Sequence, residues 1–250
     1  MLKSKYALLC ISIIVVGCIG CAANQVNEKT KAKALQNYGY ALIQEGNIRG
    51  GLQKLLEAVK LDPENADIHH ELALAYRGIQ EYQFSLRHFS KAVLLRPGFS
   101  EAHNNRGTVY LILGKWDLAI DCFEKAISNI AYKTPHFAHN NLGMAFFNKK
   151  DYDRAIASYL RAIELFPSYI VGYTNLGLAY EQVRRWEEAV DAYKKAIKYG
   201  PDYPTAHFNL GRLYLELGKQ GEGVKELKLA LELDPEGPIG RKSDKLLGGL

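Results

Sequence analysis

Two columns of small residues recur along the chain at nearly fixed intervals, and this feature limits the possible folds more than any other. Neighbouring members of each column lie 34 residues apart, with a single step of 36 at the same place in both. The first column contains Gly39, Ala73, Gly107, Gly143, Gly177 and Gly211. The second contains Ala58, Ala92, Ala126, Ala162, Ala196 and Ala230. Because the columns share the interval and its exception, we predict six copies of one structural unit.

The segment at residues 170–203 is the most regular copy and shows what the unit contains. Its apolar residues follow the spacing of an amphipathic helix in two runs, from Tyr173 to Tyr180 and from Trp186 to Ile197. The unit is therefore expected to be a pair of amphipathic helices.

Large residues recur at the same intervals as the small ones. They are Leu42, Tyr76, Tyr110, Phe146, Tyr180 and Tyr214 on the first helices, and Leu55, Phe89, Phe123, Tyr159, Tyr193 and Leu227 on the second. Prolines that would end the second helices are Pro63, Pro97, Pro167, Pro201 and Pro235. Two helices can approach closely where side chains are Gly or Ala, and large residues then fill the neighbouring gaps.

This pattern resembles the tetratricopeptide repeat, which has Leu-Gly-x-x-Tyr in its first helix, Ala and aromatic positions in its second, and a closing Pro. The resemblance covers residues 32–237. It implies an all-α fold, a right-handed superhelical solenoid of six tetratricopeptide repeats. Residues 238–250 are expected to form a C-terminal tail or a short capping helix around Ser243 to Leu247.

The overall charge and the absence of catalytic motifs narrow the class of function. The formal net charge is +5 at pH 7, and no run of Lys and Arg forms a stripe, so nucleic acid is not an expected partner. The sequence contains no Gly-rich phosphate loop, no G-x-S-x-G and no H-E-x-x-H. We expect a protein-binding molecule without catalytic residues, cofactor or small-molecule substrate.

The first 20 residues are typical of a secretory signal. Lys3 and Lys5 precede a short apolar run, which is too short for a transmembrane helix of about 20 residues. The run ends in two Gly-Cys pairs, which resemble the bacterial lipobox and its lipid-attachment cysteine. Cleavage is expected before Cys18 or Cys21, with residues 21–31 as a short tether. The alternative is a plain signal peptide in which these cysteines carry no lipid.

The lipobox resemblance also implies a location. Neither Cys18 nor Cys21 is followed by Asp, the usual inner-membrane retention signal in enteric bacteria. The resemblance therefore implies a lipid anchor in the outer membrane, with the protein on its periplasmic face. Acyl chains add about 0.8 kcal/mol per buried CH₂, so such an anchor would hold stably.

The single step of 36 lies between the third and fourth copies, where Ala131 replaces the expected proline. This connector, residues 130–136, lies between Asn104-Asn105 and Asn140-Asn141-Leu142-Gly143. It resembles the connector of PilF/PilW-type lipoproteins of type IV pilus assembly, which act as pilotins for the secretin subunit. The implied partner is a secretin subunit or another envelope-assembly component. The alternative is an ordinary loop insertion in a generic repeat adaptor lipoprotein that organises cell-wall or export enzymes.

A histidine column invites a metal-binding interpretation. It contains His69, His103, His139 and His207, with Leu35 and Tyr173 at the same position in the other copies. Residues one repeat apart occupy equivalent places on different units, so they do not converge on one ion. We therefore expect packing roles and no metal site.

The first helices are expected to display a partner-binding groove. Asparagines that could bond an extended peptide are Asn37, Asn105, Asn141, Asn175 and Asn209. Residues that would give the groove its apolar surface are Leu74, Thr108, Leu111, Met144, Phe147 and Leu178. Alternatively, the asparagines bond a neighbouring helix. Capture of a terminal carboxylate is disfavoured, since only Lys33 stands four residues before such an asparagine.

Overall fold

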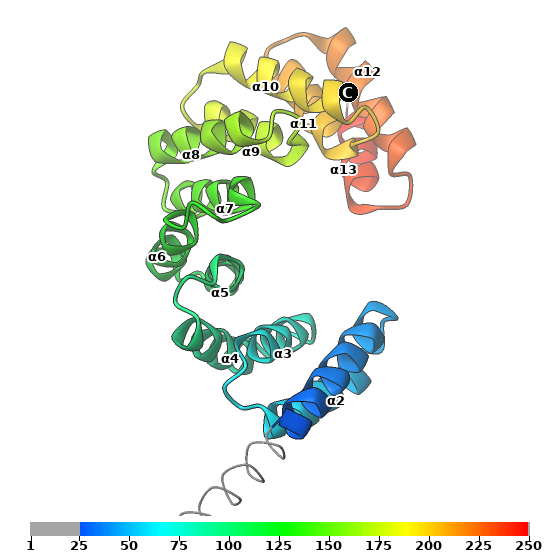
Figure 1. Cartoon of the computed structure of the whole chain (residues 1–250). Helices are drawn as coiled ribbons and strands as arrows, with labels where there is room; N and C mark the ends of the chain where they lie inside the picture. Colours follow the sequence, from blue (N-terminus) through cyan, green and yellow to red (C-terminus); the bar gives the residue numbers. More distant parts are fainter. Residues whose placement is uncertain (1–25, 250) are drawn as a thin grey trace, which may run out of the picture. The chain divides into compact units, whose positions relative to one another are not determined.

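The computed structural model describes residues 26–249, and it divides the chain into two compact units, one up to Val109 and one from Tyr110 onward. Figure 1 shows that both units consist of helices joined by short connections. Among residues 26–249 there is no β-strand. The predicted all-α class is thus confirmed, and each unit is a series of helix pairs of the tetratricopeptide kind.

The first unit begins with a helix over residues 26–44. It continues with α2 (Ile48–Leu61), α3 (Ala66–Gly78), α4 (Tyr82–Leu95) and most of α5 (Ser100–Ile112), whose last turn belongs to the second unit. Residues 26–31, which the sequence assigns to a tether, are helical in the structure. This stretch contains neither Gly nor Pro, so nothing interrupts the helix that follows it.

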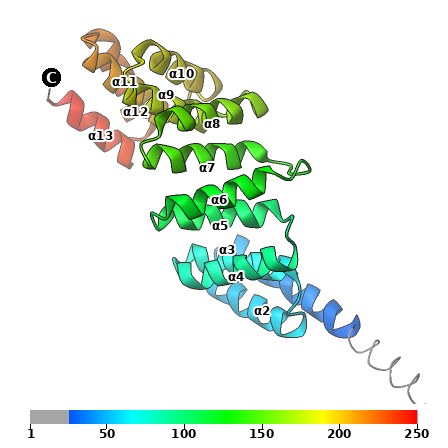
Figure 2. The ribbon, with the colours of Figure 1, turned by 90° about the vertical axis from the view of Figure 1, so that its left-hand side faces the viewer.

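The second unit contains α6 (Trp116–Ile127), α7 (Pro135–Asn148), α8 (Tyr152–Leu165), α9 (Ile170–Gln182), α10 (Trp186–Tyr199), α11 (Pro204–Glu216), α12 (Gln220–Leu233) and α13 (Pro238–Leu247). Each helix packs against the next one in sequence, and Figure 2 shows α7 and α8 side by side. None of the helices in residues 26–249 is both long and apolar enough to cross a membrane.

The turn between the two helices of each pair has the same backbone form in all six copies. One residue there takes a left-handed conformation, with φ between +58° and +84°. These residues are Gly46, Gln80, Gly114, Lys150, Arg184 and Gly218. A left-handed residue lets the chain leave the first helix sharply, so the second helix runs back along it. The second helices end two residues before the closing prolines, as predicted.

The small and large columns meet inside each helix pair. A Cβ added to Gly143 would lie 2.6 Å from the Tyr159 ring, and one added to Gly177 would lie 2.5 Å from the Tyr193 ring. In both pairs the glycine of the first helix therefore faces the large residue that lies 16 positions later. This packing confirms that glycine is needed there for the close approach of the helices.

The connector between α6 and α7 accommodates the two extra residues. Tyr132 is buried and packs with Ala126 and Ala138, while the side chain of Ile130 is fully exposed. Pro135 begins α7, where its missing N–H has no helical partner to lose. The connector is therefore anchored by one aromatic ring at its centre.

The chain ends in α13, which packs against α11 and α12. The Asp234 carboxylate accepts hydrogen bonds from the backbone N–H groups of Ile239 (2.9 Å) and Gly240 (3.2 Å). This cap, with Pro238 in the first turn, explains why the helix begins well before Ser243.

Candidate protein-binding site

A pocket of about 210 Å³ lies between the first helices of the fourth and fifth repeats. Its lining consists of Met144, Phe147 and Asn148 from α7, Tyr159 from α8, and Asn175 and Leu178 from α9. Four of these residues were proposed for the partner groove from the sequence: Met144, Phe147, Asn175 and Leu178. The structure therefore places them around one space, which we call the Met144 pocket.

The repeat geometry positions these side chains. Met144 and Leu178 each follow a glycine of the small column, Gly143 and Gly177. Since successive helical residues point about 100° apart, a glycine facing the second helix directs the next side chain away from it. Met144 is accordingly exposed, with 38% of its surface accessible. Phe147 and Leu178 are half-buried because they also pack against the core of the unit.

An asparagine pair joins the two helices beside the pocket. The Asn175 side-chain amide donates to the Asn140 side-chain oxygen at 2.9 Å, and the buried Asn140 amide donates to the Met144 sulfur at 3.7 Å. Part of the hydrogen-bonding capacity of Asn175 is therefore used between neighbouring repeats, in line with the alternative interpretation of the asparagine column.

The remaining predicted groove residues of the second unit offer less surface. Leu111 and Asn209 are 9% and 6% exposed, and Leu111 belongs to the hydrophobic core. Asn141 is half-buried on α7. These three residues lie outside the lining of the Met144 pocket.

In the first unit, the predicted groove residue Asn37 is exposed, whereas Leu74, Asn105 and Thr108 are half-buried. Asn105 shares a hydrogen bond with the His70 ring at 3.1 Å and accepts one from Arg77 at 3.4 Å. The Thr108 hydroxyl donates to the carbonyl of Asn104 at 3.1 Å, and Leu74 lies on α3. The Asn105 side chain thus also bonds a neighbouring helix, α3.

The Met144 pocket is electrostatically neutral. Among the described residues that line it, Tyr159 is the only titratable one, and burial raises the pKa of its hydroxyl above the ordinary value. An apolar lining with amide groups at its edge suits an apolar side chain flanked by peptide backbone. Tyr159 and Asn148 were not predicted as lining residues, although Tyr159 could have been inferred from its place opposite Gly143.

The histidine column has a packing role. The Nε2 atoms of His69, His103 and His207 lie 2.9–3.0 Å from the carbonyl oxygens of the prolines six residues earlier. Each ring thereby ties its first helix to the preceding connection. Among residues 26–249, no group of three or more His, Cys, Asp or Glu side chains is arranged to hold a metal ion.

The second-helix residue that faces this column differs from one repeat to the next. His69 faces His88, with the two Nδ1 atoms 2.9 Å apart, and His207 faces Glu226 at 2.7 Å. In the fifth repeat the equivalent positions hold Tyr173 and the small Ala192. Here a pocket of about 220 Å³ opens between α8, α9 and α10, which we call the Leu160 pocket.

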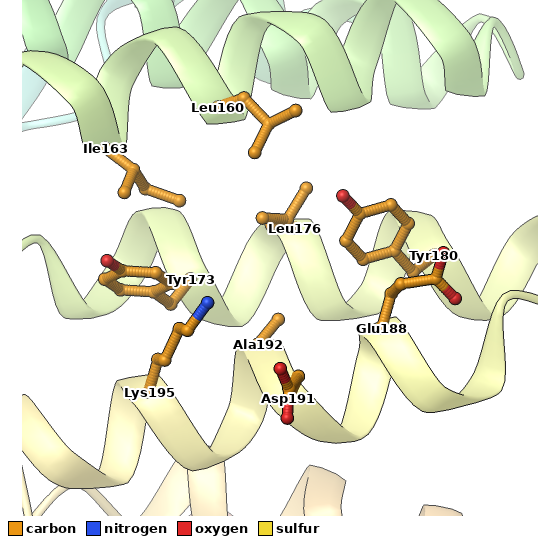
Figure 3. Close-up of a pocket in the computed structure, with 9 residues that line it drawn as sticks. All are labelled: Leu160, Ile163, Tyr173, Leu176, Tyr180, Glu188, Asp191, Ala192 and Lys195. Atoms are coloured by element: carbon orange, nitrogen blue, oxygen red, sulfur yellow. The ribbon is translucent and has the colours of Figure 1, made fainter.

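Figure 3 shows the Leu160 pocket, with Leu160 and Ile163 of α8 facing Tyr173, Leu176 and Tyr180 of α9. Glu188, Asp191 and Lys195 of α10 stand along its other edge. The Leu160 pocket combines apolar walls with charged groups, whereas the Met144 pocket is neutral.

The two cysteines predicted for lipid attachment, Cys18 and Cys21, lie outside the described residues, as does the predicted signal segment.

Models of the tetratricopeptide repeat match most of the helical region. The TPR repeat model matches residues 39–80 and 185–218, and tetratricopeptide repeat models match residues 100–129, 136–169 and 204–236. Together these segments cover more than half of the chain. The chain therefore belongs to the tetratricopeptide-repeat family, whose fold is a protein-interaction scaffold.

Individual relatives come from several systems. The BBSome complex member BBS4 of Bos taurus is 30% identical over 124 residues, which are 48% of this chain. The match spans only 24% of that protein, so the chain covers about a quarter of its length.

Two solved structures match almost from end to end. PilW, described as a widely conserved type IV pilus biogenesis factor, gives a TM-score of 0.77 at 17% identity, covering 84% of this chain and 97% of PilW. Pseudomonas aeruginosa pilF gives a TM-score of 0.75 at 17% identity, covering 88% and 99%. This likeness shows that the chain shares their fold.

Proposed function

We propose that this protein is a lipid-anchored scaffold on the periplasmic face of the outer membrane that helps the secretin of the type IV pilus to assemble. The observation that carries the proposal is the match to PilW and pilF over 97% and 99% of their lengths. The connector with two extra residues and the two Gly-Cys pairs near the N-terminus support it from the sequence.

The Met144 pocket is the proposed contact with the secretin subunit. Its volume of about 210 Å³ is enough for one aliphatic or aromatic side chain of an incoming segment. Burial of such a side chain contributes about 1.5–3 kcal/mol. The Asn148 side-chain amide donates to the Met144 carbonyl at 2.8 Å, and that of Asn175 donates to Asn140. Their side-chain oxygens at the pocket edge can therefore accept hydrogen bonds from the backbone N–H groups of the same segment.

Deletion in the native host tests the proposed function. Loss of the protein is expected to leave secretin subunits largely unassembled and to abolish twitching motility, and the full-length chain supplied in trans is expected to restore both. Secretin multimers at the wild-type level in the deletion strain would contradict the proposal.

The lipid anchor needs a separate experiment. Labelling with radioactive palmitate is expected for the wild-type protein and lost when Cys18 and Cys21 are both changed to Ser. The single changes show which cysteine carries the lipid. Undiminished labelling of the double variant would rule out attachment at these residues.

The match to BBS4, a member of a protein complex, favours a second candidate, a general adaptor. We propose cell-wall or export enzymes as the partners of such an adaptor. Cross-linking in living cells separates the two. Cross-linked products dominated by such enzymes, with secretin absent, would favour the adaptor.

A further inference from the structure

A third pocket lies beside the first turns of α10, at the turn between α11 and α12. It has a volume of about 440 Å³ and is lined by Trp186, Glu187, Val190, Asp191, Leu217 and Lys219. We call it the Trp186 pocket. It shares no residue with the Met144 pocket, so it forms a separate surface of the second unit.

The charges of this pocket are not balanced by the part of the chain that the structure describes. Glu187 and Asp191 stand one helical turn apart, and neither has an ion-pair partner among residues 26–249. The N-terminal end of the helix dipole favours Glu187, but Asp191 lies beyond the first turn. Like charges at this spacing are mildly destabilising. Lys219 is the one cation of the lining and lies 5.7 Å from the centre of the Tyr214 ring, so one negative charge remains in excess.

In the third repeat, the equivalent carboxylate forms an ion pair with a lysine of the fourth repeat. Asp117 follows Trp116 as Glu187 follows Trp186, at the same position of the repeat. Asp117 forms an ion pair with Lys149 of the next repeat. The residue equivalent to Lys149 in the sixth repeat is Leu217. Where the third repeat receives a lysine from its own chain, the fifth repeat therefore has an apolar wall and an open pocket.

We propose that the Trp186 pocket binds an arginine side chain of a protein partner. The guanidinium would lie between the carboxylates of Glu187 and Asp191, where it can form charge-assisted hydrogen bonds. Its methylene groups would pack on Val190 and Leu217, and its planar head can stack on the indole of Trp186.

The surface beside the Trp186 pocket indicates which residue should neighbour the arginine in the partner segment. Asp191 lines both the Trp186 pocket and the Leu160 pocket, so an apolar surface begins on the other side of the same carboxylate. Leu160 is 45% exposed there. A segment in which leucine neighbours arginine would fill both surfaces at once.

Tryptophan fluorescence provides a direct test. The full-length chain carrying Trp116→Phe keeps Trp186 as its single tryptophan. The probe is an acetylated and amidated peptide of alternating Leu and Arg, compared with the same peptide in which citrulline, a neutral isostere, replaces arginine. The arginine peptide is expected to change Trp186 emission and to bind about tenfold or more tightly than the citrulline peptide. The same peptide with lysine in place of arginine measures how much the planar guanidinium contributes to the affinity.

Variants of the pocket test the assignment of each group. Glu187→Gln with Asp191→Asn is expected to remove the preference for arginine. Leu217→Lys, which supplies the cation that Lys149 supplies in the third repeat, is expected to close the pocket and weaken binding. Asp117→Asn is the matched control and should bind the peptide as before. Met144→Asp should also bind it normally, which separates this surface from the proposed secretin contact.

Two results would overturn the proposal. The first is equal affinity for the arginine and citrulline peptides, and the second is undiminished binding by the double carboxylate variant. Circular dichroism of each variant shows whether the fold is intact, and Leu217→Lys gives an independent answer if the double variant unfolds.

Discussion

The α9 helix packs one face against α10, and another face lines the Met144 pocket. Two adjacent residues, Gly177 and Leu178, belong to these two faces. Gly177 faces the Tyr193 ring so closely that an added Cβ would lie 2.5 Å from it, whereas the next residue, Leu178, lines a pocket. Gly143 and Met144 on α7 repeat this arrangement. The packed face determines whether the repeat forms, and the open face is available for binding. Substitutions on the two faces should therefore affect different measurements.

The largest expected effect on stability is that of Gly177→Ala. Alanine normally stabilises a helix relative to glycine, but here its methyl group would meet a fully buried ring, and we expect a loss of about 2 kcal/mol. The matched control is Gly221→Ala on α12, where an added Cβ meets nothing within 4 Å. That change should stabilise the protein by less than about 1 kcal/mol, because Gly221 lies in the first turn of α12. Urea denaturation of both variants measures the difference, and the same sign for both would contradict this account of the packed face.

Tyr193→Phe should have a somewhat smaller effect. The Tyr193 hydroxyl donates to the buried Glu181 carboxylate at 2.5 Å, which Arg212 also contacts at 2.7 Å. Loss of this charge-assisted bond is expected to cost about 1.5 kcal/mol. Tyr159→Phe, one repeat earlier, is the control, because no hydrogen bond of the Tyr159 hydroxyl is found among residues 26–249. An equal loss in both variants would show that the bond to Glu181 is not the cause.

The packed interior also contains the groups that respond to pH. Burial lowers the pKa of His70 and of His88 to about 4. The unfolded chain, with histidines near 6.5, therefore binds protons first, so stability falls as the pH drops from about 6.5 toward 4.

One interior histidine, His207, has the opposite effect on how stability depends on pH. The Glu226 carboxylate raises the pKa of His207, so this pair stabilises the fold below pH 6.5 and loses that contribution as the pH rises through the raised value. Denaturation at pH 7 and pH 5 should show a net loss at pH 5 in the wild type. Glu226→Gln should deepen this loss, and His88→Gln should reduce it. Binding at the uncharged Met144 pocket should not change over this range.

The smallest effect on stability is expected on the open face. Met144 is exposed and its sulfur accepts only a weak hydrogen bond from Asn140, so Met144→Asp should change the free energy of unfolding by less than about 1 kcal/mol. Phe147 is less suitable for this purpose, because it packs against the core and against the ring of Tyr152. Thermal denaturation of both variants would show whether Met144 alone separates binding from folding.

Much of the fold could be predicted because the repeat columns report directly on helix packing. A glycine that recurs every 34 residues opposite a large residue leaves few alternatives to a helix pair, and the prolines set the ends of the second helices. The same spacing identified Met144, Phe147, Asn175 and Leu178 as neighbours on the first helices.

Other features of the fold and of the pockets depend on contacts that the repeat spacing of the sequence does not reveal. Leu111 occupies the same repeat position as Phe147, yet it is buried in the core, whereas Phe147 is only partly buried. The partners His88 and Glu226 come from second helices, where the type of residue differs between copies. The start of α13 depends on a cap by Asp234, and the Trp186 pocket depends on the replacement of a lysine by Leu217.

The central claim is that the open face between α7 and α9 binds the partner, and the affinity of the purified secretin subunit for the full-length protein tests it most directly. The comparison is between wild type, Met144→Asp and Leu118→Asp, an equivalent change at an exposed leucine of α6 outside the pocket. We expect Met144→Asp to weaken binding about tenfold or more, because a charge cannot enter an apolar contact without losing its hydration. Leu118→Asp should bind as the wild type does. Equal affinity of all three proteins would contradict the claim.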